Sequence, residues 1–121
     1  MTRILYVDDE ADIREVAQMA LELDPDFQVR TCASGAEALE AAPAWQPDLI
    51  LLDVMMPGMD GPAVFARLLQ EPRTAGIPVV FITARTQSHE VSSYLGLGAR
   101  GVLAKPFDPM ALSQQVSERL G

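Results

Sequence analysis

Short apolar runs alternate with segments of helical spacing along the whole chain, and this alternation limits the fold more than any other feature. Four runs are apolar throughout: Ile4–Val7, Leu49–Leu52, Pro78–Ile82 and Gly101–Ala104. A run without polar alternation is typical of a strand that is buried on both faces, as in a parallel sheet. Phe27–Cys32 has the composition of a fifth strand.

Helical spacing follows each of these runs. After the first run, apolar residues recur at positions 13, 16, 17, 20 and 23, and Asp24-Pro25-Asp26 ends the pattern. Further helices are predicted around Val64–Leu69 and from about Ser88 to Leu97. Five repeats of strand and helix predict one α/β domain over residues 1–121, with a parallel sheet covered by helices on both faces.

Three local signals predict helix boundaries. Ser34 and Glu37 have the spacing of a capping box, so a helix is expected to start after Ser34. Pro43 and Pro47 are expected to bracket the loop that follows that helix. Asp108-Pro109 resembles an N-cap followed by proline, so the last helix is expected to start there.

Composition excludes several classes of function. The formal net charge of −8 repels nucleic-acid phosphates and suits a cation or a basic partner, although it can equally serve solubility alone. No apolar run has the length of a membrane span. Cys32 is the only cysteine, so no internal disulfide or cysteine metal site is possible, and the reducing cytoplasm is the simplest location.

Polar residues stand where the predicted strands end. Asp8 and Asp9 follow the first strand, Asp53 the third, Thr83 the fourth and Lys105 the fifth. The carboxyl ends of parallel strands share one edge of the sheet, where open α/β sheets bind ligands. These five residues are therefore expected to converge on one site.

Three carboxylates at one edge require compensating positive charge. Two unit charges at about 4 Å repel by roughly 4 kcal/mol at an effective dielectric constant near 20. Lys105 supplies one positive charge, and a Mg²⁺ ion, which prefers hard oxygen ligands, would supply two more.

The same residues could carry phosphoryl chemistry. A carboxylate can attack phosphorus and form an aspartyl-phosphate, and a metal, an ammonium and a hydroxyl can stabilise the transition state. Asp53 is the predicted nucleophile, with Lys105 and Thr83 as donors. The chain has no glycine-rich P-loop, so a nucleotide pocket is not indicated.

Four segments in this order resemble the receiver domain of two-component response regulators. They are Ile4–Glu10 (ILYVDDE), Asp53–Gly61 (DVMMPGMDG), Phe81–Ala84 (FITA) and Lys105–Phe107 (KPF). The resemblance implies a flavodoxin-like three-layer fold with strand order 2-1-3-4-5 and five helices. It also implies that Asp53 receives its phosphoryl group from a phosphohistidine on a sensor histidine kinase or a histidine phosphotransfer protein.

The resemblance assigns further roles within the site. It implies that Asp8, Asp53 and the backbone carbonyl of Met55 bind Mg²⁺ directly, with Asp9 acting largely through water. The Met55 side chain would lie over the phosphoryl site, and Arg85 would reach its rim. A cis peptide bond is expected before Pro106.

Val102 departs from the family pattern, which usually has an aromatic residue three positions before the lysine. Valine is stiff about χ1 and cannot swing between an exposed and a buried position. Thr83 can still move, so the rearrangement on phosphorylation is expected between Ala84 and Gly98 instead. Because the sequence ends at Gly121 with no output domain, a stand-alone switch that acts through an unidentified partner protein is expected.

Two other functions compete with the phosphorylated switch, relay or phosphate sink. A phosphatase working through an aspartyl-phosphate would need an acid two residues after the nucleophile, where this chain has Met55. A docking module that no longer accepts phosphate would have lost site residues, and all five are present. The chain is therefore predicted to be a signalling switch rather than an enzyme.

Overall fold

A computed structural model describes residues 1–120 and has one sheet of five parallel strands. The strand order is β2-β1-β3-β4-β5, as the resemblance implied. The strands are β1 (Thr2–Val7), β2 (Phe27–Cys32), β3 (Leu49–Asp53), β4 (Val79–Thr83) and β5 (Gly101–Ala104). All five predicted strands are confirmed.

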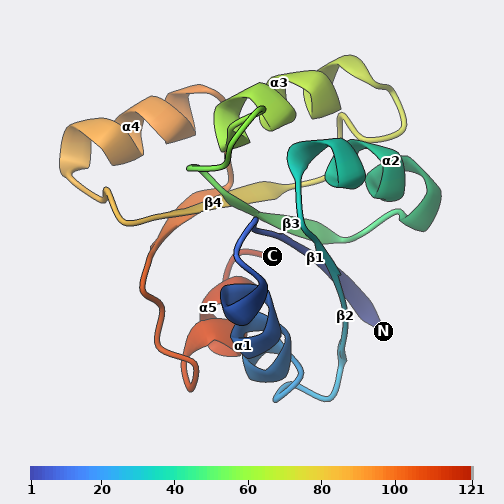
Figure 1. Ribbon diagram of the computed structural model, residues 1–121, viewed down its shortest axis with the longest axis vertical. Helices are drawn as coiled ribbons and strands as arrows, with labels where there is room; N and C mark the ends of the chain where they lie inside the picture. The colour runs from blue at the N-terminus through green and yellow to red at the C-terminus, as the bar shows by residue number, and fades with distance from the viewer. Residues whose placement is uncertain (121) are drawn as a thin grey trace.

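The helices cover both faces of the sheet, which gives three layers (Figure 1). Helices α2, α3 and α4 lie on one face and α1 and α5 on the other. Their bounds are α1 (Ala11–Leu21), α2 (Gly35–Trp45), α3 (Gly61–Gln70), α4 (Ser88–Gly96) and α5 (Leu112–Ser117). The predicted flavodoxin-like fold is therefore confirmed.

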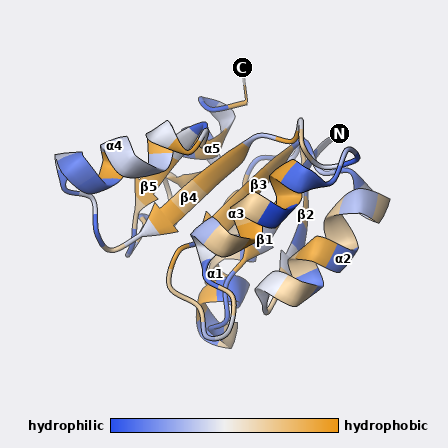
Figure 2. Cartoon of the chain, turned by 90° about the horizontal axis from the view of Figure 1, so that it is seen from above, coloured by the Kyte–Doolittle hydropathy of each residue, from blue (hydrophilic) through white to orange (hydrophobic). Residues whose placement is uncertain are grey.

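Two apolar clusters, one on each face, hold the layers together. Residues of β3 and β4 are buried throughout, and Figure 2 shows this apolar centre of the sheet beneath mixed helices. Alternate residues of β1 enter opposite clusters: Leu5 packs under α2 and α3, and Tyr6 packs against α1 and α5. Burying one large apolar side chain contributes about 1.5–3 kcal/mol, so the sheet is the stable platform of the fold.

The strand register aligns the ends that carry polar residues. Val7 pairs with Leu52, Asp53 with Ile82, and Thr83 with Ala104. The residues that follow these pairs leave the sheet at a common edge, which places Asp8 and Lys105 beside Asp53.

Two helix starts are fixed by side-chain caps. The Ser34 hydroxyl accepts a hydrogen bond from the Glu37 backbone N–H at 3.1 Å, and the Glu37 carboxylate accepts one from the Ala33 N–H at 3.2 Å. The predicted start of α2 is confirmed. Asp60 caps α3 by accepting a hydrogen bond from the Ala63 N–H at 2.9 Å.

Pro43 lies inside α2 and not in the loop that follows it, so that prediction was wrong. Proline lacks an N–H donor, so the carbonyl four residues earlier loses its helical hydrogen bond, and the ring crowds the preceding turn. Helix α2 ends at Trp45, and Gln46 takes a left-handed conformation with φ of 55°. The Gln46 side chain then donates to the Pro43 carbonyl at 3.0 Å.

The last helix begins at Leu112 and not near Asp108-Pro109, so the predicted start was also wrong. The Asp108 carboxylate accepts a hydrogen bond from the Met110 N–H at 2.9 Å, two residues on. This contact has the geometry of a cap, and the Asp108 carbonyl accepts hydrogen bonds from the N–H groups of Ala111 and Leu112 at 3.0 Å, but residues 109–111 form turns, so the α-helix itself starts only at Leu112.

The apolar face of α1 is narrower than its spacing predicted. Ala17, Ala20 and Leu21 are buried, whereas Val16 is 42% exposed and Leu23, beyond the helix end, is 57% exposed. Within residues 1–120, no helix combines the length and hydropathy of a membrane span.

Candidate functional site

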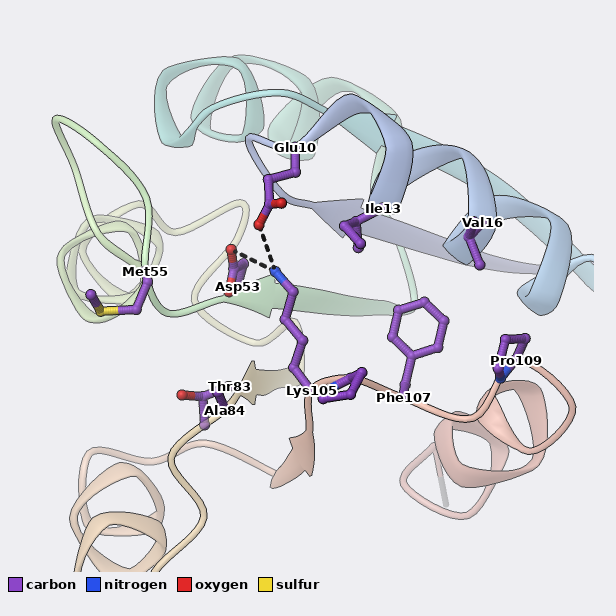
Figure 3. Close-up of a pocket in the computed structure, with 11 residues that line it drawn as sticks. Glu10, Ile13, Val16, Asp53, Met55, Thr83, Ala84, Lys105, Phe107 and Pro109 are labelled. Carbon is purple, nitrogen blue, oxygen red and sulfur yellow. Dashed lines mark hydrogen bonds and ion pairs between the residues drawn. The ribbon is translucent and has the colours of Figure 1, made fainter.

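Lys105 lies among three carboxylates at the carboxyl edge of the sheet, and Figure 3 shows two of them, Asp53 and Glu10. Its Nζ is 2.9 Å from Asp8 Oδ2, 3.3 Å from Asp53 Oδ2 and 3.6 Å from Glu10 Oε1. Lys105 directly follows β5. The Lys105–Pro106 peptide bond after it is cis, as expected. One ammonium therefore joins the ends of β1, β3 and β5.

Asp8 is completely buried, and both of its carboxylate oxygens accept hydrogen bonds. Oδ2 accepts from Lys105 Nζ and from the Tyr6 hydroxyl, each at 2.9 Å, and Oδ1 accepts from the Glu10 N–H at 3.0 Å. The Arg14 guanidinium donates to the Asp8 carbonyl at 2.8 Å. Burial, and then the Asp8 charge, raise the pKa of Tyr6 well above its usual value, so the phenol keeps its proton and donates.

Asp53 is 3% exposed and lies at the base of the site. Burial, followed by the negative charge of Asp8, raises the pKa of Asp53 to about 6, although Lys105 and the Met55 backbone N–H oppose the shift. Helix α3 starts directly against this residue: a Cβ on Gly61 would lie 2.6 Å from the Asp53 carbonyl oxygen. The nucleophile predicted from sequence is thus held on a rigid support.

The charge on Lys105 is secured by its neighbours. Burial alone lowers the pKa of Lys105, but the hydrogen bond that Lys105 donates to Asp8 and the charges of Asp53 and Asp8 outweigh this effect, and the pKa is raised. The side chain stays cationic, as a donor to an anionic group requires.

Thr83 closes β4 and is 2% exposed. Its hydroxyl accepts a hydrogen bond from the Arg85 backbone N–H at 3.1 Å. Thr83, Asp53 and Lys105 line the same pocket, so the structure brings together all three residues predicted for phosphoryl chemistry.

Oxygen ligands for a cation lie beside Lys105. Carboxylate oxygens of Asp8, Asp9 and Glu10 can lie within 4.8 Å of one another, with Asp9 and Glu10 exposed. Sequence reasoning selected Asp8 and Asp9 but missed Glu10, although the acidic triplet that it completes was visible in the sequence.

The pocket beside Asp53 is mainly apolar and has a volume of about 580 Å³. Figure 3 shows Ile13 and Val16 of α1 on one side, with Phe107 and Pro109 of the β5–α5 segment facing them. This apolar wall was not predicted, because its residues come from two segments that are far apart in the sequence.

Three further residues singled out in the sequence, Met55, Arg85 and Val102, lie at the edge of the site or outside it. Met55 lines the pocket and is 68% exposed. Arg85 is exposed in the segment after Thr83 and lines a second, polar pocket with His89 and Glu90. Val102 is partly buried in β5, opposite Phe81 of β4, and packs against the cluster under α2 and α3.

Relatives of this chain are response regulators. Transcriptional regulatory protein CseB of Streptomyces avermitilis is 40% identical over 115 residues, which cover 95% of this chain and 47% of that protein. DNA-binding response regulator MtrA of Mycobacterium tuberculosis is 39% identical over 118 residues, covering 98% and 50%. The chain thus spans about half the length of these curated relatives.

Solved structures of similar length share the whole fold. Chemotaxis response regulator CheY4 of Vibrio cholerae has a TM-score of 0.89 and 31% identity, covering 98% of both chains. A response regulator from Desulfuromonas acetoxidans has a TM-score of 0.87 and 30% identity, covering 99% of this chain and 97% of that one.

The family model for the response regulator receiver domain matches residues 4–117. This match includes every strand end that contributes to the site described above, from Asp8 to Lys105. The chain belongs to the family of response regulator receiver domains.

Proposed function

We propose that this receiver accepts a phosphoryl group on Asp53 from a phosphohistidine and so works as a signalling switch, relay or phosphate sink. The observation that carries the proposal is the buried Asp53 carboxylate, 3.3 Å from the Lys105 ammonium, in a pocket that also contains Thr83. A nucleophile, a cation and a hydroxyl converge there, and these are the groups that phosphoryl transfer requires.

The donor set fits Mg²⁺. Carboxylate oxygens of Asp8, Asp9 and Glu10 gather beside Asp53, and hard oxygen ligands of this kind suit Mg²⁺. We propose that Asp8, Asp9, Asp53 and the Met55 carbonyl hold the ion. Its charge would favour the approach of an anionic phosphoryl group to the acidic site.

The roles of Asp8 and Asp9 toward the ion are open to a refinement. Both Asp8 oxygens already accept hydrogen bonds in the buried interior, whereas Asp9 is exposed. This favours Asp9 as a direct ligand and Asp8 as a partner through water, the reverse of the division implied by the family resemblance.

The chain's own residues would carry out the transfer. A carboxylate oxygen of Asp53 forms a bond to phosphorus while the bond from phosphorus to the histidine nitrogen breaks. Lys105 and Thr83 donate to phosphoryl oxygens, which stabilises the charge that they carry in the transition state. Lys105 would leave its present contact with Asp53 to do so.

The apolar side of the pocket supports a protein as phosphoryl donor. Ile13, Val16 and Phe107 border the pocket that reaches Asp53, so a helix carrying a phosphohistidine could pack there while its histidine enters the site. A sensor histidine kinase or a histidine phosphotransfer protein has this chemistry. Such donors act in the cytoplasm, which is the proposed location.

A phosphatase remains the weaker candidate. No acid from residues 1–120 other than Glu10 and Asp53 lines the pocket, and Met55 occupies the position where a leaving-group acid would be needed. The chain's net charge of −8 favours a protein as output partner over a nucleic acid. The DNA-binding and transcriptional roles named for MtrA and CseB belong to proteins about twice as long.

Asp53→Asn should abolish labelling by acetyl phosphate and Mg²⁺, because the amide cannot act as the nucleophile. Mass spectrometry of the intact protein would measure the added phosphoryl group. Asp60→Asn is the matched control, since asparagine caps a helix as well as aspartate does and should leave labelling unchanged. Labelling of Asp53→Asn at the wild-type rate would exclude Asp53 as the acceptor.

Mg²⁺ should raise the melting temperature, because it relieves the repulsion between Asp53 and Asp8, which adds to the effect of burial in raising the pKa of Asp53. At ten times its dissociation constant the ion should add about 1.4 kcal/mol of stability, or a shift of about 5 °C in a domain of this size. Calorimetry with Asp8→Ala and Asp9→Ala should show smaller shifts, and Glu40→Ala on α2 the full shift. An unchanged melting curve in millimolar Mg²⁺ would refute the metal site.

Met55→Ala and Arg85→Ala should change the lifetime of the phosphorylated protein about three- to tenfold, because side chains over the acyl phosphate control the approach of water. Phosphorylation itself should persist in both variants. The decay of labelled protein after removal of acetyl phosphate measures the effect, with Met19→Ala on the exposed side of α1 as the control. Identical decay in all the variants would disprove gating.

Amide chemical shifts should change mainly between Ala84 and Gly98 when Mg²⁺ and beryllofluoride are added, apart from residues beside the site. Helix α4 contains no buried residue and lacks a side-chain cap, so less free energy opposes its movement than that of α3, even with the Tyr94 ring packed against Phe81. Changes centred on Val102 and α5 would contradict this prediction. They would show that the rearrangement still occurs where the family usually has an aromatic residue, despite the valine.

A further inference from the structure

The Tyr6 hydroxyl is a second donor to the carboxylate oxygen that holds Lys105. Tyr6 lies in β1 with its ring completely buried among apolar residues between the sheet and α1 and α5. Its hydroxyl emerges beside Asp8, two residues along the same face of the strand, and donates to Oδ2 at 2.9 Å. A phenylalanine would fill the same apolar volume, so packing alone does not explain the hydroxyl.

The shared oxygen matters because Lys105, one of its two side-chain donors, is also the proposed donor to the phosphoryl group. In the present arrangement Lys105 contacts Asp8 at 2.9 Å and Asp53 at 3.3 Å. A shift of Lys105 toward a phosphoryl oxygen on Asp53 would lengthen its contact with Asp8. Asp8 is completely buried, and a buried carboxylate that loses a donor is strongly destabilised.

We propose that Tyr6 is a positioning residue that keeps Asp8 hydrogen-bonded when Lys105 turns to the phosphoryl group. With the Tyr6 hydroxyl and the Glu10 N–H in place, each Asp8 oxygen retains a donor after the lysine leaves. Without the hydroxyl, Asp8 would compete more strongly for Lys105 and hold it back from the phosphoryl oxygens. This inference rests on the proposed function, since it concerns how Asp53 and Lys105 bind a phosphoryl group.

Tyr6→Phe separates this role from simple packing, because the proposal predicts different effects on two ligands. Affinity for beryllofluoride, a phosphoryl mimic, should fall about three- to tenfold in saturating Mg²⁺, since Lys105 must leave an Asp8 that has no other side-chain donor. Affinity for Mg²⁺ alone should be unchanged or tighter, because Asp8 loses a competing donor. Calorimetry measures both affinities on the full chain.

A merely structural role would weaken both affinities in parallel, and that result would overturn the proposal. An unchanged affinity for beryllofluoride would overturn it too. Tyr94→Phe is the matched control, because it removes the hydroxyl of the only other tyrosine. Tyr94 lies in α4, and its ring packs against Phe81 of β4. If the wild-type protein binds neither ligand, the proposed function fails, and that result differs from a failure of the Tyr6 role alone.

A second measurement leaves Tyr6 in place, so it does not depend on how well Tyr6→Phe folds. Carbon-13 at the tyrosine Cζ position reports how strongly the phenol donates, and Tyr94→Phe leaves Tyr6 as the only labelled residue. Adding beryllofluoride to Mg²⁺-saturated protein should move the Tyr6 resonance toward the phenolate position, because its hydroxyl becomes the only side-chain donor to Asp8 Oδ2. A resonance that does not move would contradict the proposal.

Discussion

The contact between one ammonium and three carboxylates organises this molecule. Lys105 Nζ lies within 3.6 Å of oxygens of Asp8, Asp53 and Glu10, which come from segments up to 97 positions apart in the sequence. Removing the lysine would leave the two buried acids without their opposing charge, and an uncompensated buried charge costs several kcal/mol. Because the strands are parallel, their ends hold these acids close enough to repel one another. A cation is therefore needed between them.

Most of this arrangement could be predicted from the sequence, because both the apolar runs and the polar residues that follow them are local patterns. Apolar runs marked the strands, and a parallel sheet brings all carboxyl ends to one edge, so Asp8, Asp53, Thr83 and Lys105 could be placed together without coordinates. The order of the strands came from the family resemblance and not from hydrophobic pattern. The apolar wall formed by Ile13, Val16 and Phe107 could not be predicted, because it depends on how α1 packs against the segment after β5.

The incorrect or missed predictions also have local physical causes. Pro43 was expected to lie beyond the helix, but α2 continues for two residues past it despite the lost hydrogen bond, and ends where Gln46 turns left-handed. The Asp108 carboxylate does accept the N–H two residues on, as a cap would, but the residues that follow form turns and the α-helix starts only at Leu112. Tyr6 was counted as one apolar strand residue among four, and nothing in the sequence indicated that its hydroxyl reaches Asp8.

Gly61 gives the site a mechanical asymmetry. Because a Cβ at this position would meet the Asp53 carbonyl at 2.6 Å and the Val54 Cα at 2.9 Å, the first turn of α3 rests directly on the backbone that carries Asp53, the proposed phosphoryl acceptor. The backbone at Asp53 is therefore closely packed on the α3 side, whereas α4, which lies on the same face of the sheet and contacts β5, has no buried residue. Of the two helices beside the site on this face, α4 is therefore the less constrained, and a displacement would meet less resistance there than at α3.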